Sequence, residues 1–572
     1  MVLDDDQRRI AEAEPDHRQL VIAGPGAGKT EVVAALVGNL VGVHDVYADE
    51  ILIVSFSRAA VHAVRQRLAD AIEDAYLIEV RTLDSLAYEL TVGDRDEMSG
   101  FDATVRAATK RLEEDGWQYL EQVRHVVVDE VQDVVGIRAD FVRALLQRVD
   151  ASCGFTLLGD PMQAVYDFQF ARARKARRTR LLDSVGSDAA VGKHHLVNEY
   201  RSRSPDASRA ASLRKCLAEA TDDVTRRNLI QDFVADVVPM GNIETEGRLI
   251  DRWSGSTAVL CRDNIDVLRT AGVLRRAGLS VTIQRAASER SYAPWIAGLL
   301  GEFPTSTISR HSFLDLAGTA GLQDAELLWS ALRRTAAGRG ADLDLRALAA
   351  GLSGGRRQAE LESSTDTSIV VSTVHRAKGL QFDNVVLVNA DQWLRDDDAE
   401  SVRVLFVGLT RSRDRLAVAV LEQQRGWFQA GRSERYFRRG REGWQTFGVE
   451  IRGSDTSGLG PTSASLTGGI GLPVSWQLDR DKSDLTAPVY CAVQGDSVVA
   501  RTTSGFGEDF AARIGSAERR ATPWPFLLEG AYVEALETVA GNPPASSGTG
   551  RHGLWLSTRV TGAVDLSWRE PS

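Results

Sequence analysis

The chain has 572 residues and a mass of 62.3 kDa, which is room for about four domains of ordinary size. Its 68 Lys and Arg stand against 79 Asp and Glu, and the net charge of −11 excludes a protein that is basic throughout, although a locally basic groove remains compatible with nucleic-acid binding. An acidic N-terminus, the lack of any apolar run near ~18 residues and four dispersed cysteines without a CxxC pair predict a cytoplasmic protein with no signal peptide, membrane span or zinc ribbon.

Short apolar segments alternate with helix-like segments such as 59–71 in the first half of the chain. Buried parallel strands are predicted at 20–23, 51–55, 125–128 and 155–158. The same alternation returns at 257–261, 368–372, 385–388 and 416–420. This pattern predicts two α/β lobes rather than one long sheet.

The remaining segments have other compositions. Residues 291–365 are helical and rich in Ala, Leu and Arg, as in an insertion within the second lobe. Residues 453–472 are rich in Gly, Ser and Thr, which is typical of a linker. From Pro473 onward, β-like runs at 474–478, 488–493 and 497–502 predict a small β-rich domain with no evident chemistry.

A phosphate-binding loop is indicated at residues 23–30, which read AGPGAGKT. Ala23 stands where the strict motif has Gly, and Pro25 and Ala27 fill variable places. Gly24, Gly26 and Gly28 would let backbone N–H groups curl around phosphates. Lys29 would reach the β- and γ-phosphates and Thr30 would hold Mg²⁺.

An acidic pair follows the predicted strand at 125–128, in the sequence HVVVDEVQD. Asp129 would contact the metal, and Glu130 would orient and deprotonate the attacking water. Alone, such a pair is weak evidence for a site, but downstream of a phosphate-binding loop it indicates ATP hydrolysis.

Six motifs occur in this order: AGPGAGKT, DEVQD, LLGDPMQAVYDF, NEYRS, STVHRAKGLQF and VGLTRSR. Together they resemble the superfamily 1 helicases of the UvrD/Rep/PcrA family over roughly residues 3–425. The resemblance implies two RecA-like lobes that bind ATP between them and single-stranded DNA across their top, stepping 3′ to 5′.

The resemblance also divides the chain into domains. It implies a first lobe with a shortened insertion, a second lobe with a shortened helical insertion, a linker, and a β-rich domain of unknown role. The predicted bounds are 1–185 with the insertion at 91–124, then 186–290 and 366–450 with the insertion at 291–365, then 451–472, then 473–572.

Further nucleotide contacts follow from the resemblance. Gln7 resembles the glutamine that reads adenine, with a solvated helix residue as its alternative, and Tyr200 resembles the tyrosine that stacks on adenine. Gln163 resembles the residue that senses the γ-phosphate. Arg201 and Arg411 resemble the two arginines that neutralise charge on the γ-phosphate in the transition state.

Contacts with DNA are implied at four positions. Phe168 resembles an aromatic residue on which a base stacks, and Phe56, Thr373 and His375 match positions near the strand. For Phe56 and Phe168 the alternative is core packing. The densest basic run, at 172–180, either contacts phosphates or forms a solvated helix face.

Several positions depart from the family pattern. Gln381 replaces a glutamate that is associated with the ribose, Glu31 replaces an arginine, and Asp84 replaces a histidine. These changes should weaken the affinity for the nucleotide and for single-stranded DNA without removing a charged group that ATP hydrolysis needs.

Because the insertions are short, the sequence supports ATP-driven movement along DNA better than processive separation of the two strands of a duplex. The expected activity is therefore that of an ATP- and Mg²⁺-dependent translocase and 3′–5′ helicase, in DNA repair or in defence against foreign DNA. Its partners would be single-stranded DNA, with a duplex junction as an option, and a protein bound through 473–572. The alternative is a regulatory ATPase that senses DNA and gates a partner nuclease.

Overall fold

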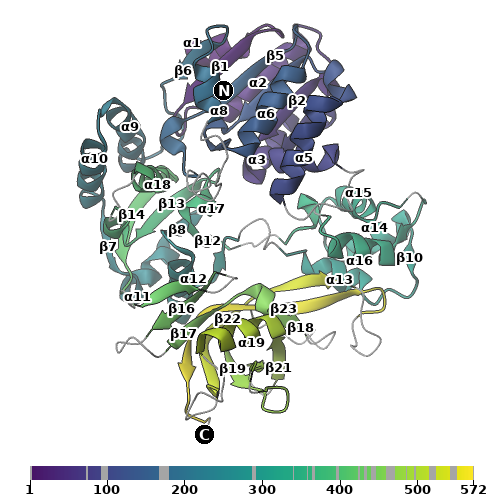
Figure 1. The fold of residues 1–572 in the computed structure, drawn as a ribbon, viewed down its shortest axis with the longest axis vertical. Helices are drawn as coiled ribbons and strands as arrows, with labels where there is room; N and C mark the ends of the chain where they lie inside the picture. Colours follow the sequence, from purple (N-terminus) through teal and green to yellow (C-terminus); the bar gives the residue numbers. More distant parts are fainter. Residues whose placement is uncertain are drawn as a thin grey trace. The chain divides into compact units, whose positions relative to one another are not determined.

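The computed structural model (Figure 1) shows two compact units. The first comprises 1–240, 254–260 and 377–419, and the second comprises 241–253, 261–376 and 420–572. The residues whose structure is described are 3–72, 75–91, 101–166, 180–285, 291–338, 340–356, 358–363, 367–394, 399–422, 426–430, 434–439, 446–458, 470–484, 486–494, 497–514, 524–541 and 550–570. Among them, no helix combines the length and the apolar character that crossing a membrane would require.

A six-stranded sheet of parallel strands forms the first lobe, in the order β3-β2-β4-β5-β1-β6. Its strands are β1 (Arg18–Ala23), β2 (Ile51–Ser55), β3 (Glu79–Thr82), β4 (His125–Asp129), β5 (Gly154–Gly159) and β6 (Gly192–Leu196). Helices α1 (Asp5–Ala11), α2 (Lys29–Gly42) and α3 (Arg58–Ala69) contribute to one buried cluster, and α4 (Leu83–Leu90), α5 (Phe101–Glu114), α6 (Ile137–Arg148) and α8 (Leu181–Gly186) to the other.

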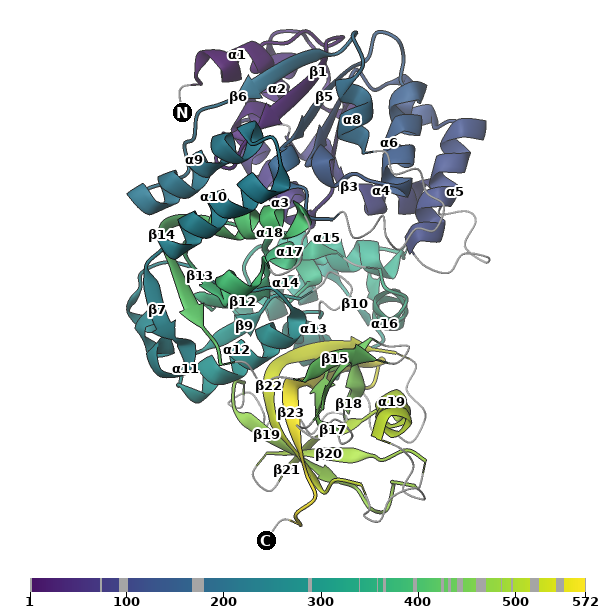
Figure 2. The ribbon, with the colours of Figure 1, turned by 60° about the vertical axis from the view of Figure 1, so that its left-hand side comes forward.

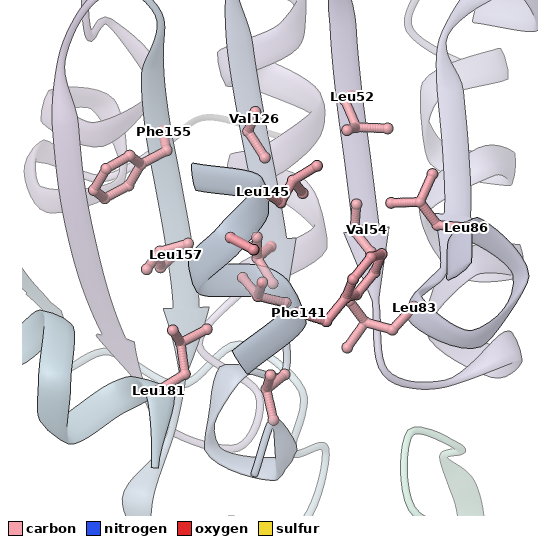
Figure 3. Close-up of a cluster of buried hydrophobic side chains, with 14 of the residues drawn as sticks. Leu52, Val54, Leu83, Leu86, Val126, Phe141, Leu145, Phe155, Leu157 and Leu181 are labelled. Carbon is pink, nitrogen blue, oxygen red and sulfur yellow. The ribbon is translucent and has the colours of Figure 1, made fainter. Parts of the chain in front are cut away.

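The side chains of each strand point alternately to the two faces of the sheet and so divide between these two clusters. Ile51 and Ile53 of β2 belong to the cluster with α2 and α3, while Leu52 and Val54 belong to the cluster with α4 and α6, shown in Figure 3. Successive side chains of a strand point to opposite faces, so a strand buried on both faces is apolar at every position. That is why these strands could be predicted as continuous apolar runs.

The second six-stranded sheet has the order β7-β14-β13-β8-β12-β9. Its strands are β7 (Pro239–Asn242), β8 (Thr257–Cys261), β9 (Val281–Ile283), β12 (Ile369–Thr373), β13 (Phe382–Val388) and β14 (Ser412–Val420). β13 is parallel to β8 and β14, and β12 is parallel to β9. The associated helices are α9 (Pro205–Glu219), α10 (Asp223–Ala235), α11 (Ile243–Glu246), α12 (Asn264–Arg276), α17 (Val374–Ala377) and α18 (Ala399–Leu409). The predicted fold class, two RecA-like lobes with a β-rich C-terminal sheet, is confirmed.

The predicted boundary between the two lobes, at residue 186, differs from the observed one. β6 pairs with β1, from Gln19 opposite Gly192 to Ala23 opposite Leu196, so it belongs to the first sheet. The prediction that the second lobe starts at 186 is therefore wrong for this strand. The strand reads GKHHL and is largely exposed at the edge of the sheet, so it lacks the apolar run that marks the other strands.

The helical insertion contains α13 (Pro294–Leu300), α14 (Arg310–Thr319), α15 (Ala325–Ala336) and α16 (Leu345–Ser353), with the short β10 (Thr307–Ile308) and β11 (Leu343–Asp344). Its core includes the aromatic side chains of Phe313 and Trp329. It also includes Leu554, which is fully buried and belongs to the C-terminal sheet.

The C-terminal sheet has nine strands, in the order β15-β16-β17-β23-β22-β19-β20-β21-β18. They are β15 (Trp427–Ala430), β16 (Arg435–Arg439), β17 (Thr446–Ile451), β18 (Thr456–Gly458), β19 (Pro473–Leu478), β20 (Tyr490–Gln494), β21 (Ser497–Thr502), β22 (Leu527–Ala540) and β23 (Leu554–Ser567), with the helix α19 (Ser504–Ile514). β17 pairs with β23, placing Val449 opposite Val564. The sheet thus begins at Trp427, whereas the predicted β-rich domain begins at 473, because the intervening Gly, Ser and Thr content is typical of a linker.

β22 and β23 form a long antiparallel hairpin, drawn in yellow in Figures 1 and 2. Its tip joins the helical insertion. The backbone N–H of Ala297 donates to Thr538 Oγ1 at 3.0 Å, and that hydroxyl donates to the Ala293 carbonyl at 2.6 Å. The C-terminal sheet and the helical insertion therefore share a core.

Candidate nucleotide site

The site lies at the carboxyl edge of the first sheet. β1 pairs with β5, and β5 pairs with β4, all in parallel, so their carboxyl ends meet at one edge. The loop 23–30 leaves β1 there, and α2 begins directly at Lys29. Asp129 ends β4, and Asp160 follows β5.

Two glycines of the loop adopt a backbone conformation that other residues disfavour. Gly26 and Gly28 have φ of 75° and 79°, in the left-handed region that side chains disfavour. A Cβ on Gly26 would lie 2.9 Å from Cβ of Arg201, and one on Gly28 would lie 2.6 Å from Nε2 of Gln7. The loop therefore has no room for a side chain at either position.

Lys29 is paired with Glu130. Its ammonium lies 3.0 Å from Oε1 of the glutamate, and the two side chains are only 14% and 13% exposed. Burial works to lower the pKa of Lys29, but the carboxylates of Glu130 and Asp129 outweigh it and raise that pKa. Burial likewise works to raise the pKa of Glu130, but Lys29 and Lys378 hold it below its usual range. Both groups are charged at neutral pH.

A hydrogen-bonded chain runs from Glu130 toward the second sheet. The Gln132 amide donates to Glu130, and Oε1 of Gln132 accepts from the Asp160 backbone N–H at 3.0 Å. Nε2 of Gln163 donates to Asp160 at 2.9 Å, and its Oε1 accepts from Arg411 at 3.2 Å. These contacts join Lys29, through Glu130, to an arginine beside β14 by way of side chains that are almost all buried.

Glu130 itself has φ 58°, an unusual left-handed conformation for a glutamate. Its backbone N–H donates to Oδ1 of Asp129 at 2.8 Å. Such backbone strain persists where surrounding contacts hold it and is frequent at functional sites.

Two arginines lie at the same site, Arg411 buried and Arg201 half-buried. Arg411 is 3% exposed and donates to the Val407 carbonyl at 3.0 Å. Arg201 donates to the Thr410 carbonyl at 3.1 Å. Burial, and then the positive charge of Arg411, lower the pKa of Arg201 to about 9. Two guanidinium groups that repel each other out of water favour an anion between them.

A second side of the site surrounds Gln7. This residue is fully buried and donates to the Ala27 carbonyl at 3.1 Å, so the alternative of a solvated helix residue is wrong. The Tyr200 backbone N–H donates to the Gly26 carbonyl at 2.9 Å, and its hydroxyl donates to Asp4. The Tyr200 ring is partly exposed, at 44%. Gln381 accepts from Arg413 at 2.6 Å.

Two departures from the family pattern have local partners. Glu31 accepts two hydrogen bonds from Arg67, at 2.6 and 2.5 Å, and Asp84 lies 2.9 Å from Arg138. Each carboxylate is therefore neutralised by an arginine on a neighbouring helix.

The residues predicted near DNA are described in part. The ring of Phe56 lies 4.9 Å from that of Tyr166, and the Lys378 ammonium lies 5.8 Å from the Tyr166 ring. Thr373 is buried at the end of β12, in the second unit, where Oγ1 accepts from the Arg376 backbone N–H at 3.4 Å. His375 lies in α17, which follows directly. Phe168 and the basic run up to residue 179 lie outside the described residues.

Four polar side chains of the site were not singled out by sequence reasoning: Gln132, Asp133, Asp160 and Arg214. Asp160 is fully buried and accepts from Arg214 at 3.1 Å, and Asp133 lies 2.5 Å from the Lys378 ammonium. Three of the four fall within the motifs DEVQD and GDPMQ. Acidic and amide residues at strand ends were the signal that could have identified them.

Two family models match the chain. One, described as an AAA domain, matches residues 7–169, which include the phosphate-binding loop and the acidic pair. The other, described as a UvrD-like helicase C-terminal domain, matches residues 368–419, which include Arg411. The crystal structure of Pif1 helicase from Candida albicans aligns with 74% of this chain and 96% of its own, at 12% identity and a TM-score of 0.39. A search of curated proteins found no match.

Proposed function

We propose that the chain is an ATP-driven translocase on single-stranded DNA with 3′–5′ polarity; its similarity to an AAA domain and to a UvrD-like helicase C-terminal domain, as in superfamily 1 helicases, supports this proposal. The observation that carries this proposal is the buried chain of contacts from Lys29 through Glu130, Gln132, Asp160 and Gln163 to Arg411. It links the group that would bind phosphate to one that belongs to the second sheet.

In the proposed mechanism, ATP displaces Glu130 from Lys29. The lysine turns to the β- and γ-phosphates, which lie against the backbone of Gly24, Gly26 and Gly28. Adenine lies on the side of Gln7 and Tyr200, and Gln381 lies near the ribose. The exchange of a carboxylate for phosphates keeps the buried ammonium neutralised throughout.

Mg²⁺ fits this arrangement because Thr30 and Asp129 offer a hydroxyl and a carboxylate oxygen, the ligands it prefers. Asp129 lies close enough to Lys29 to help raise the lysine's pKa, so a metal held by Asp129 would lie near the phosphates that Lys29 is proposed to bind. When bound, the metal would neutralise phosphate charge.

Glu130, once freed from Lys29, is the proposed base. Its release from Lys29 removes the chief charge that lowers the pKa of Glu130, so the freed carboxylate would be a stronger base for orienting and deprotonating water. Arg201 and Arg411 would neutralise charge on the γ-phosphate. Gln163 would sense whether the γ-phosphate is bound and would couple its binding to Phe56 and Tyr166. Phe56, Phe168, Thr373 and His375 are the proposed contacts with the strand.

The second candidate is a regulatory ATPase that senses DNA and gates a partner nuclease. It is favoured by the nine-stranded C-terminal sheet, whose residues 473–572 would hold a protein partner. In either case the biological setting is DNA repair or defence against foreign DNA, in the cytoplasm.

Directional displacement of streptavidin from DNA distinguishes the translocase from the regulatory ATPase. An oligonucleotide carrying biotin and streptavidin at one end is incubated with protein and ATP, and release of streptavidin is timed. The proposed translocase should displace it from the 5′ end, toward which a 3′–5′ motor moves, and hardly at all from the 3′ end. Displacement from the 3′ end would contradict the polarity. ATP turnover without displacement at either end would favour the regulatory ATPase.

A further inference from the structure

The first two strands of the C-terminal sheet lie in an unusually basic segment. Residues 425–445 contain six arginines, two glutamates and five aromatic residues, in a chain whose net charge is −11. Interleaved arginines and aromatics are typical of surfaces that bind single-stranded nucleic acid, because guanidinium groups contact phosphates and rings stack on bases.

β15 and β16 form an antiparallel pair at the edge of the sheet, with Trp427 opposite Arg438 and Phe428 opposite Phe437. β15 is the terminal strand of the sheet (Figure 2). We define the hairpin patch as Trp427, Phe428, Arg438, Arg439 and Arg513. The last of these comes from α19.

Phe428 lies at the centre of the patch. The Arg439 guanidinium lies 4.4 Å from its ring centroid, and the Arg513 guanidinium lies 4.5 Å from it. A third guanidinium, that of Arg438, lies 6.0 Å from the Trp427 ring. Because successive side chains of a strand point to opposite faces, Trp427 and Arg438 lie on one face of this edge, while Phe428, which also packs against the apolar core, lies on the other with Arg439 and Arg513.

The charges in this region are unevenly compensated. Arg435 is buried with Asp455 at 2.5 Å and Asp509 at 3.3 Å, and Arg438 pairs with Asp565 at 2.5 Å. Arg439 and Arg513 form no ion pair within the described residues, although both lie beside the same ring. Their mutual repulsion would be relieved by an anion bound between or above them.

We propose that the hairpin patch binds single-stranded nucleic acid, with Arg439 and Arg513 on successive phosphates. This rests on the proposed function, because it gives the translocated strand a second contact outside the motor. Contacts of this kind read the phosphate backbone, so the patch would bind without sequence preference.

A purely structural role would have the same arginines cover the edge of the apolar core. Arg480 provides the matched control. Its guanidinium lies 5.1 Å from the Phe526 ring in the same sheet, but it is paired with Glu570. It therefore shares the contact with an aromatic ring but lacks the uncompensated charge.

The test uses the full-length chain and a labelled oligothymidylate, with affinity measured by fluorescence anisotropy over a range of salt concentrations. Arg439→Gln with Arg513→Gln should weaken binding roughly tenfold at low salt, and the slope of log affinity against log salt should fall by about 0.7 for each lost phosphate contact. Arg480→Gln should bind like the wild type. Arg439→Lys with Arg513→Lys should keep the salt slope, and melting temperatures should show that all variants fold.

Unchanged affinity and slope in the double glutamine variant would overturn the proposal. Binding of polyglutamate, an acidic polypeptide, is measured in parallel. A double glutamine variant that loses binding to polyglutamate but keeps its affinity for the oligonucleotide would also overturn the proposal, because the patch would then be a surface for acidic proteins. A wild-type chain that binds the oligonucleotide through the patch but shows no DNA-dependent ATP turnover would contradict the proposed motor and leave the patch standing.

Discussion

Glu130→Gln should abolish most ATP turnover while leaving ATP bound at least as tightly as in the wild type. A general base contributes about 10²–10⁴-fold to a rate, and turnover should fall by that factor. Binding should not weaken, because Glu130 lies 3.0 Å from the Lys29 ammonium and competes with phosphate for it in the free chain. The amide removes that competitor. Single-turnover hydrolysis and equilibrium binding of a fluorescent ATP analogue measure the two quantities.

Two controls accompany this variant. Lys29→Ala should lose both binding and hydrolysis, since it removes the cation that meets the phosphates. Glu31→Gln removes a nearby carboxylate that is paired with Arg67 instead, and turnover should stay close to the wild-type value. Wild-type turnover in Glu130→Gln would show that another group activates the water.

Arg411→Ala should reduce ATP turnover by about 10³-fold or more, as expected when an arginine that stabilises the γ-phosphate transition state is lost. Sequence reasoning alone suggests that such a change spares the fold. The side chain is buried, however, and donates to the Val407 and Leu380 carbonyls. The variant should therefore also lose about 1–3 kcal/mol of stability, because those carbonyls lose a donor.

Stability and chemistry can be separated in this case. Arg411→Lys keeps a positive charge but not the planar fork, so turnover should still fall strongly while the variant remains folded. Arg415→Ala, at an exposed position of β14, the strand that follows Arg411, should leave turnover and melting temperature near wild type. Normal turnover in Arg411→Ala, measured at a temperature where it is folded, would remove this residue from the proposed catalytic set.

The parts of the fold that were predictable are those where local pattern and burial agree. β2 and β4 contain the apolar runs 51–54 and 126–128 because both faces of these strands are covered, and the glycines of 24–28 indicate a phosphate-binding loop from the sequence alone. β6 could not be predicted in this way because an exposed edge strand such as GKHHL carries no apolar run. β17 and β18 were missed because their pairing partners, β23 and β21, lie beyond residue 490.

The candidate site shows the same division. Lys29, Glu130 and Arg411 stand in recognisable motifs, but spacing along the chain does not reveal the link between them. Gln132 reaches the Asp160 backbone across 28 positions of the sequence, and Arg411 reaches Gln163 across 248. Such contacts depend on the order of strands in the sheets, which motif spacing does not specify.

The most direct test of the account is the steady-state rate of ATP hydrolysis by the full-length chain, measured with and without single-stranded DNA at low and high salt. Because Lys378 contacts both Asp133 of the acidic motif and the Tyr166 ring beside Phe56, a proposed contact with the strand, DNA should raise turnover severalfold or more at low salt. High salt should remove much of that stimulation, since phosphate contacts weaken as salt rises. An ATP turnover that single-stranded DNA leaves unchanged at every salt concentration would contradict the proposed translocase.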